Sequence, residues 1–132
     1  MILVVDDDAL PAGALAVAFE KEGYQVRIAN DGGEAYQYVK DPECKLLLLD
    51  MHMPRVNGAE LLILMANDGI RVPTIVMSSF RDFTSAELKE FPNVVTFLQK
   101  PFEMSELLSA VRKHLPQAAT NKRRGTAGKV SR

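Results

Sequence analysis

Acidic side chains follow two apolar runs of this sequence, at the point where each run stops. Asp6 and Asp7 come directly after residues 2–5, and Asp50 comes directly after residues 46–49. A buried aspartate is unfavourable unless a cation or hydrogen-bond donors meet it. The candidate ligand atoms are oxygens, without a histidine or thiolate cluster, and this donor set fits a hard cation such as Mg²⁺ best. The acids therefore predict a Mg²⁺ site with Asp50 as a possible nucleophile.

Two further polar residues follow later apolar runs and complete a set that could move a phosphoryl group. Ser78 comes after residues 74–77, and Lys100 comes shortly after residues 94–98. Phosphoryl transfer needs little beyond positioning of the nucleophile and neutralisation of the charge on the phosphoryl oxygens. A metal ion, the Lys100 ammonium and the Ser78 hydroxyl could each take one oxygen while Asp50 forms an aspartyl phosphate. The set therefore predicts phosphoryl transfer to Asp50.

Each of these features has an ordinary structural explanation when it is taken alone. Two aspartates after a strand often cap a helix, a serine at a strand end is usually a turn residue, and a Lys-Pro pair is usually part of a surface loop. The chemical reading depends on all of them lying at the ends of different strands. It therefore stands only if the fold brings those ends together.

The apolar pattern predicts a fold that brings these strand ends together. Continuous apolar runs are typical of strands buried on both faces of a parallel sheet, and helical spacing recurs between them. Strands alternating with helices predict a doubly wound α/β fold, in which the carboxyl ends of the strands share one edge and bind ligands there. The expected strands cover residues 2–5, 24–29, 46–50, 74–77 and 94–98, and the expected helices cover 11–22, the segment around 35–39, 57–67, a short segment from Thr84, and 103–115.

Composition restricts the class of protein. The chain of 132 residues is the size of one domain, and its net charge of -1 argues against a general nucleic-acid-binding surface. Its single cysteine, Cys44, excludes an internal disulfide and suits a reducing compartment. The apolar runs are shorter than the ~20 residues that span a bilayer, and the N-terminus lacks the pattern of a signal peptide. A cytoplasmic protein without a membrane partner is expected.

The C-terminal segment differs from the rest of the chain. Residues 117–132 are rich in Ala, Thr, Gly, Lys and Arg and include the basic cluster 122–124. We interpret this segment as a disordered tail or a linker, which leaves residues 1–116 as the folded domain. An effector domain would need far more sequence than the tail provides, so nucleic-acid binding by this chain is not supported.

In order along the chain, the motifs are Val4-Val5-Asp6-Asp7, Asp50 with Met53-Pro54 and Gly58, Ser78, and Lys100-Pro101-Phe102. With these motifs the chain resembles the receiver domain of two-component response regulators (the CheY-like family) over residues 1–115. The resemblance implies a five-stranded parallel sheet with strand order 2-1-3-4-5.

The resemblance also implies roles for the polar residues. Asp50 is the phosphoacceptor, charged by a phosphohistidine on a sensor histidine kinase or a histidine phosphotransfer protein. Asp7 is a main Mg²⁺ ligand, Asp6 acts largely through a bound water, and the backbone carbonyl of His52 completes the protein's share of the metal shell. Lys100 holds a phosphate oxygen and is similar to the family lysine that often precedes a cis-proline.

The family further implies a conformational switch. Ser78 moves toward the phosphoryl group, and the aromatic ring of Phe97 turns inward behind it, here by packing alone because Phe97 has no hydroxyl. The responding surface is the fourth helix, fifth strand and fifth helix, at residues 84–114. It would contact a downstream effector protein, a missing output domain or a second copy of the chain. Such a protein is a signalling domain, whose only catalysis is its own phosphorylation and dephosphorylation.

The sequence leaves two other functions open. A Mg²⁺-dependent phosphohydrolase with an aspartyl nucleophile would use a similar sheet, but such enzymes usually carry a second acid two residues after the nucleophile, where this chain has His52. A receiver-like module that binds partners without phosphorylation is the other alternative. The intact acids, serine and lysine count against it.

Overall fold

The computed structural model describes residues 1–51, 58–78 and 90–115 of the chain. Several predictions concern residues outside these ranges and are not tested by the structure. They are the metal-ligand role of the His52 carbonyl, the Met53-Pro54 motif, the helix expected from Thr84, and the tail at residues 117–132.

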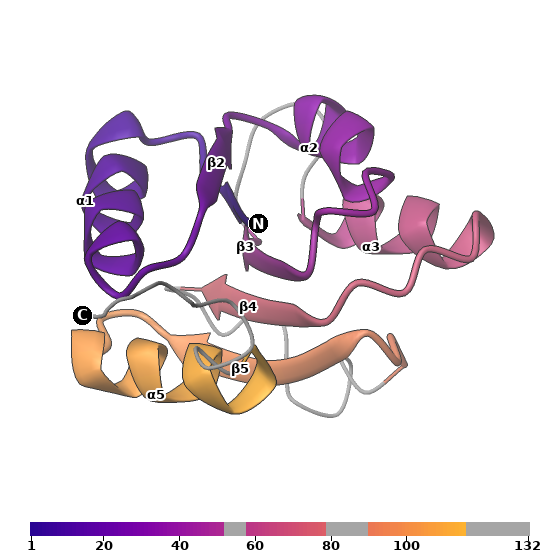
Figure 1. The fold of residues 1–132 in the computed structure, drawn as a ribbon. Helices are drawn as coiled ribbons and strands as arrows, with labels where there is room; N and C mark the ends of the chain where they lie inside the picture. The colour runs from indigo at the N-terminus through magenta and orange to yellow at the C-terminus, as the bar shows by residue number, and fades with distance from the viewer. Residues whose placement is uncertain (52–57, 79–89, 116–132) are drawn as a thin grey trace.

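The strands form one parallel sheet in the order β2-β1-β3-β4-β5, as the resemblance implied (Figure 1). The three inner strands are buried along their whole length, which explains their continuous apolar sequences. The edge strand β2 is only partly buried, in line with its alternating sequence. The strand bounds are β1 Ile2–Val5, β2 Val26–Ala29, β3 Leu46–Asp50, β4 Thr74–Ser78 and β5 Val94–Gln99.

The described helices cover both faces of this sheet (Figure 1). One apolar cluster joins α1 and α5 to one face, and a second cluster joins α2 and α3 to the other. The doubly wound α/β fold is thereby confirmed. No helix in the described ranges is long and apolar enough to cross a membrane. The helix bounds are α1 Ala9–Lys21, α2 Gly32–Val39, α3 Gly58–Asn67 and α5 Met104–His114.

The start of α1 differs from the sequence prediction. The helix begins at Ala9 rather than Pro11, because the Asp8 carboxylate accepts a hydrogen bond from the backbone N–H of Leu10 at 3.2 Å and caps the helix. Pro11 fits inside the first turn, where backbone N–H groups have no intrahelical acceptor. Since Asp8 supplies the cap, helix capping does not account for Asp6 and Asp7.

The first residues of the predicted second strand, Tyr24 and Gln25, lie between α1 and β2 instead. Gly23 adopts a positive φ of 95°, and the backbone N–H of Tyr24 donates to the carbonyl of Phe19 at 3.1 Å, so β2 starts only at Val26. The Tyr24 hydroxyl donates to the carbonyl of Leu115 at 2.7 Å. This bond ties the end of α5 to the turn after α1.

Candidate phosphoryl-transfer site

Sheet hydrogen bonding fixes the backbone of the polar residues at the carboxyl edge. The N–H of Asp6 continues the β1–β2 ladder with a bond of 3.1 Å, and the N–H of Lys100 donates to the carbonyl of Ser78 at 2.7 Å. Asp50 is the last residue of β3 and pairs with Met77 of β4. The parallel sheet thus brings together residues that are far apart in the sequence, as predicted.

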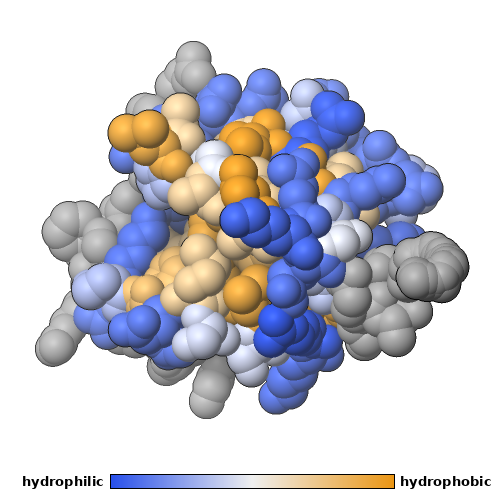
Figure 2. Space-filling view, turned by 60° about the vertical axis from the view of Figure 1, so that its left-hand side comes forward, coloured by the Kyte–Doolittle hydropathy of each residue, from blue (hydrophilic) through white to orange (hydrophobic). Residues whose placement is uncertain are grey.

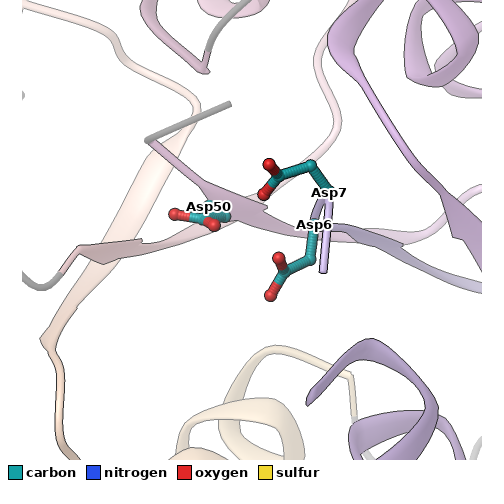
Figure 3. A group of neighbouring side chains, drawn as sticks. All are labelled: Asp6, Asp7 and Asp50. Carbon is teal, nitrogen blue, oxygen red and sulfur yellow. The ribbon is translucent and has the colours of Figure 1, made fainter. Parts of the chain in front are cut away.

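Three carboxylates meet at this edge (Figure 3). Asp6, Asp7 and Asp50 each offer one oxygen, and these oxygens all lie within 4.8 Å of one another. Asp6 and Asp50 are buried, whereas Asp7 is exposed. Oxygen ligands with an open side suit Mg²⁺, which binds one or two carboxylates and keeps several waters. The cluster therefore fits the expected metal ion.

Lys100 places a positive charge beside Asp50. Its Nζ lies 3.5 Å from Oδ2 of Asp50, and its side chain stays 30% exposed, so the ammonium can also meet an incoming group. The Lys100–Pro101 peptide bond is cis, as the resemblance led us to expect. Asp50 thus has two carboxylates, those of Asp6 and Asp7, and one cation, the Lys100 ammonium, as neighbours.

The environment of Asp6 shows why this edge calls for a cation. Burial raises the pKa of Asp6 above its ordinary value of 3.8, and the charge of Asp50 raises it further. The backbone N–H of Asp8, which donates to Asp6 at 2.9 Å, and the charge of Lys100 oppose this rise. Without a metal ion, the folded chain therefore holds the Asp6 proton more tightly than the unfolded chain does.

This raised pKa predicts how stability depends on pH in the absence of divalent metal. Because the folded chain holds the Asp6 proton more tightly than the unfolded chain, the stabilisation is complete below pH 3.8 and is lost as pH rises through the folded-state pKa. Asp6→Asn should therefore gain stability over the wild type as pH rises above about 4. Urea unfolding in EDTA over a pH series measures this difference, with Asp68→Asn as control. A difference that does not change with pH would contradict the assignment.

Ser78 and Phe97, the two residues of the expected switch, lie on the neighbouring strands β4 and β5. Ser78 is fully buried at the end of β4. It shares a sheet face with Val76 by strand alternation, and Val76 is paired in register with Phe97 of β5. Phe97 is partly buried and packs against the cluster that includes α2 and α3. The serine and the ring therefore occupy the same face of the sheet.

An apolar groove borders the site. It has a volume of about 690 Å³ and lies between the start of α1 and the connection from β5 to α5. Figure 2 shows hydrophobic residues gathered on this side of the molecule. Asp6 and Lys100 are the charged residues of its lining, and Leu10, at the start of α1, is 83% exposed. The groove is lined by Asp6, Pro11, Ala14, Leu15, Met77, Lys100, Pro101, Phe102 and Met104.

The sequence did not reveal how closely Gly58 approaches the backbone of Asp50. Gly58 is buried at the start of α3, and a Cβ built on it would lie 3.0 Å from the carbonyl oxygen of Asp50. Gly58 is one of the motif residues of the resemblance, but no local pattern distinguishes a glycine required by a tertiary contact from one that simply begins a helix.

Comparison with known proteins identifies the family. The family model of the response regulator receiver domain matches residues 2–112. The chain therefore belongs to the response regulator receiver domain family, whose members act in two-component signalling and hold Mg²⁺ in an acidic pocket.

Two relatives contain the matching domain in chains of different length. Sporulation initiation phosphotransferase F of Bacillus subtilis (strain 168) is 33% identical over 115 residues, which cover 87% of this chain and 93% of that protein. The DNA-binding response regulator MtrA of Mycobacterium tuberculosis (strain ATCC 25618 / H37Rv) is also 33% identical over 115 residues, which cover 86% of this chain and 50% of MtrA. The chain thus spans about half the length of MtrA.

Solved structures agree with the fold. The response regulator TrrA of Thermotoga maritima, determined in complex with Mg²⁺ and BeF, has a TM-score of 0.75 and 26% identity, with 86% of this chain and 97% of TrrA covered. The receiver domain of the Francisella response regulator 1452 also has a TM-score of 0.75, with 29% identity over 85% of this chain and 93% of that domain.

Proposed function

We propose that this chain is a phosphorylation-dependent switch of a two-component or phosphorelay system, in which Asp50 accepts a phosphoryl group from a phosphohistidine. One observation carries the proposal: the Asp50 carboxylate lies within 4.8 Å of the Asp6 and Asp7 carboxylates and 3.5 Å from the Lys100 ammonium. A nucleophile, a metal-binding set and a cation for the phosphoryl oxygens thus meet at one point.

The transfer itself uses few groups. An Asp50 carboxylate oxygen forms the new bond to phosphorus while the bond from phosphorus to the histidine nitrogen breaks, and the imidazole leaves with that electron pair. The Lys100 ammonium turns from the carboxylate to a phosphoryl oxygen, and the Ser78 hydroxyl donates to another. Asp7 and Asp50, with Asp6 acting through water and with the backbone carbonyl of His52, would hold Mg²⁺, which would supply neutralisation of the remaining charge.

The surroundings of the site support a protein as phosphoryl donor. The apolar groove that Asp6 and Lys100 help to line is larger than a small phosphate ester needs, and Leu10 is exposed next to its lining residue Pro11. A sensor histidine kinase or a histidine phosphotransfer protein is therefore the proposed donor.

The proposed output surface includes β5 and α5, which flank Lys100 in the sequence. Phosphorylation draws Ser78 toward the phosphoryl group, Phe97 repacks behind it, and the surface that includes β5 and α5 changes. That surface would bind an effector protein, an output domain or a second copy of the chain. We further propose that the folded signalling domain covers residues 1–116, with residues 117–132 as tail or linker, that it works in the cytoplasm, and that it catalyses only its own phosphorylation and dephosphorylation.

Asp50→Asn is expected to abolish phosphorylation, since the amide oxygen is a far weaker nucleophile than the carboxylate. Wild type and variant are incubated with acetyl phosphate, with Mg²⁺ or with EDTA, and intact mass is measured. The wild type should gain one phosphoryl group only with Mg²⁺, and the variant none. Steady phosphate release without an adduct would favour a phosphohydrolase, and no reaction at all would favour a phosphorylation-independent module.

A further inference from the structure

The start of α3 rests against the backbone of the phosphoacceptor strand, at Gly58. A Cβ on Gly58 would lie 2.7 Å from Sδ of Met51, 2.8 Å from Cα of Met51 and 3.0 Å from the carbonyl oxygen of Asp50. Such separations are shorter than packed carbon atoms tolerate. Any larger residue therefore forces a movement where α3 meets the strand.

Neither side of this junction can yield freely. The Met51 thioether is flexible and could turn away, but the Met51 backbone is held in place, because its N–H donates to the carbonyl of Met77 at 3.1 Å. Met51 itself is only 2% exposed. On the other side, α3 is held by the buried side chains of Leu61, Leu62 and Met65. A Cβ at Gly58 would therefore shift the Asp50–Met51 backbone or lift the start of α3.

We propose that Gly58 is a positioning residue for phosphoryl transfer: its lack of a side chain lets α3 sit directly against Asp50 and Met51 and so holds the Asp50 carboxylate in line with the donor. This inference rests on the proposed function. Displacing a reacting group by about 1 Å can cost about a hundredfold in rate. The shift expected here is smaller, so a loss of about tenfold is expected.

The test compares Gly58→Ala with Gly13→Ala in the full chain. Gly13 lies within α1, and a Cβ there meets nothing within 4 Å. Initial rates of phosphorylation are measured against acetyl phosphate concentration at saturating Mg²⁺, with an osmolyte in every reaction to keep destabilised variants folded. Rates are expressed per folded molecule from circular dichroism. Gly58→Ala should lower the maximal rate about tenfold with little change in the half-saturating concentration, and Gly13→Ala should match the wild type.

Two further variants separate positioning from simple packing. In Met51→Ala/Gly58→Ala the thioether is gone but the new methyl group still collides with the Met51 backbone. The double variant should therefore stay slow, while Met51→Ala alone stays close to the wild type. Leu61→Ala destabilises the same helix without adding a Cβ and should keep its rate per folded molecule.

The outcomes are distinguishable. A wild-type rate in Gly58→Ala, rescue in the double variant, or an equal loss in Leu61→Ala would overturn the positioning role while leaving Asp50 as the phosphoacceptor. Absence of any adduct in the wild type would overturn the proposed function and the inference together.

Discussion

Asp7→Asn is expected to weaken Mg²⁺ binding about thirtyfold. Asp7 is the exposed member of the three-carboxylate cluster, so the substitution removes a full charge without disturbing the core. Two unit charges about 4 Å apart interact by about 1 kcal/mol in water, and a divalent ion doubles this to about 2 kcal/mol, which corresponds to the stated change in Kd. Isothermal titration calorimetry with Mg²⁺ measures the effect.

Asp8→Asn is the matched control for this prediction. Asp8 is adjacent in sequence but caps α1 rather than joining the cluster, and asparagine caps helices equally well. Its Kd should stay within about threefold of the wild type, since an exposed charge that does not contact the ion interacts with it only weakly through water. Equal losses in the two variants would show that Mg²⁺ responds only to diffuse surface charge, and no loss in Asp7→Asn would remove Asp7 from the ligand set.

Lys100→Met is expected to affect phosphorylation and metal binding in opposite directions. The rate with acetyl phosphate should fall by about a hundredfold, because a donor aimed at the developing charge of the transferred group is lost. Mg²⁺ affinity should rise, because a positive charge 3.5 Å from Asp50 no longer repels the ion. Calorimetry and the rate of phosphoryl adduct formation give the two readouts.

Opposite changes exclude simple misfolding, which would lower both quantities. Lys113→Met serves as control, since Lys113 is exposed in the last turn of α5, and both readouts should match the wild type. A Lys100→Met protein that binds Mg²⁺ more weakly would show that Lys100 supports the structure of the acid cluster rather than facing the phosphoryl group.

Much of the fold and most of the site could be predicted from the sequence, because both follow from patterns that are local in the chain. The runs at residues 46–49 and 74–77 are apolar throughout since both faces of those strands are covered. Once the strands are parallel, Asp50, Ser78 and Lys100 must share an edge. No distance between side chains had to be known for that conclusion.

What could not be predicted depends on tertiary contacts. The α1 cap is Asp8, although three consecutive aspartates offer equivalent chemistry, because only Asp8 has the geometry to reach the N–H of Leu10. Tyr24 continues the alternating polar and apolar pattern of the second strand. It is hydrogen-bonded to the carbonyls of Phe19 and Leu115, however, and not to a neighbouring strand. The close approach of Gly58 to Asp50 involves residues that no periodicity connects.

Locating the phosphoryl group in the chain would show directly whether Asp50 accepts it. Wild-type protein treated with acetyl phosphate and Mg²⁺ is reduced with borohydride, which converts an aspartyl phosphate to homoserine, and is then digested with trypsin. Cleavage after Lys45 and Arg55 releases a peptide of residues 46–55 whose only acidic side chain is Asp50, whereas Asp6 and Asp7 fall in the peptide of residues 1–21. We expect homoserine at position 50 alone. Homoserine in the peptide of residues 1–21, or in neither peptide, would contradict it.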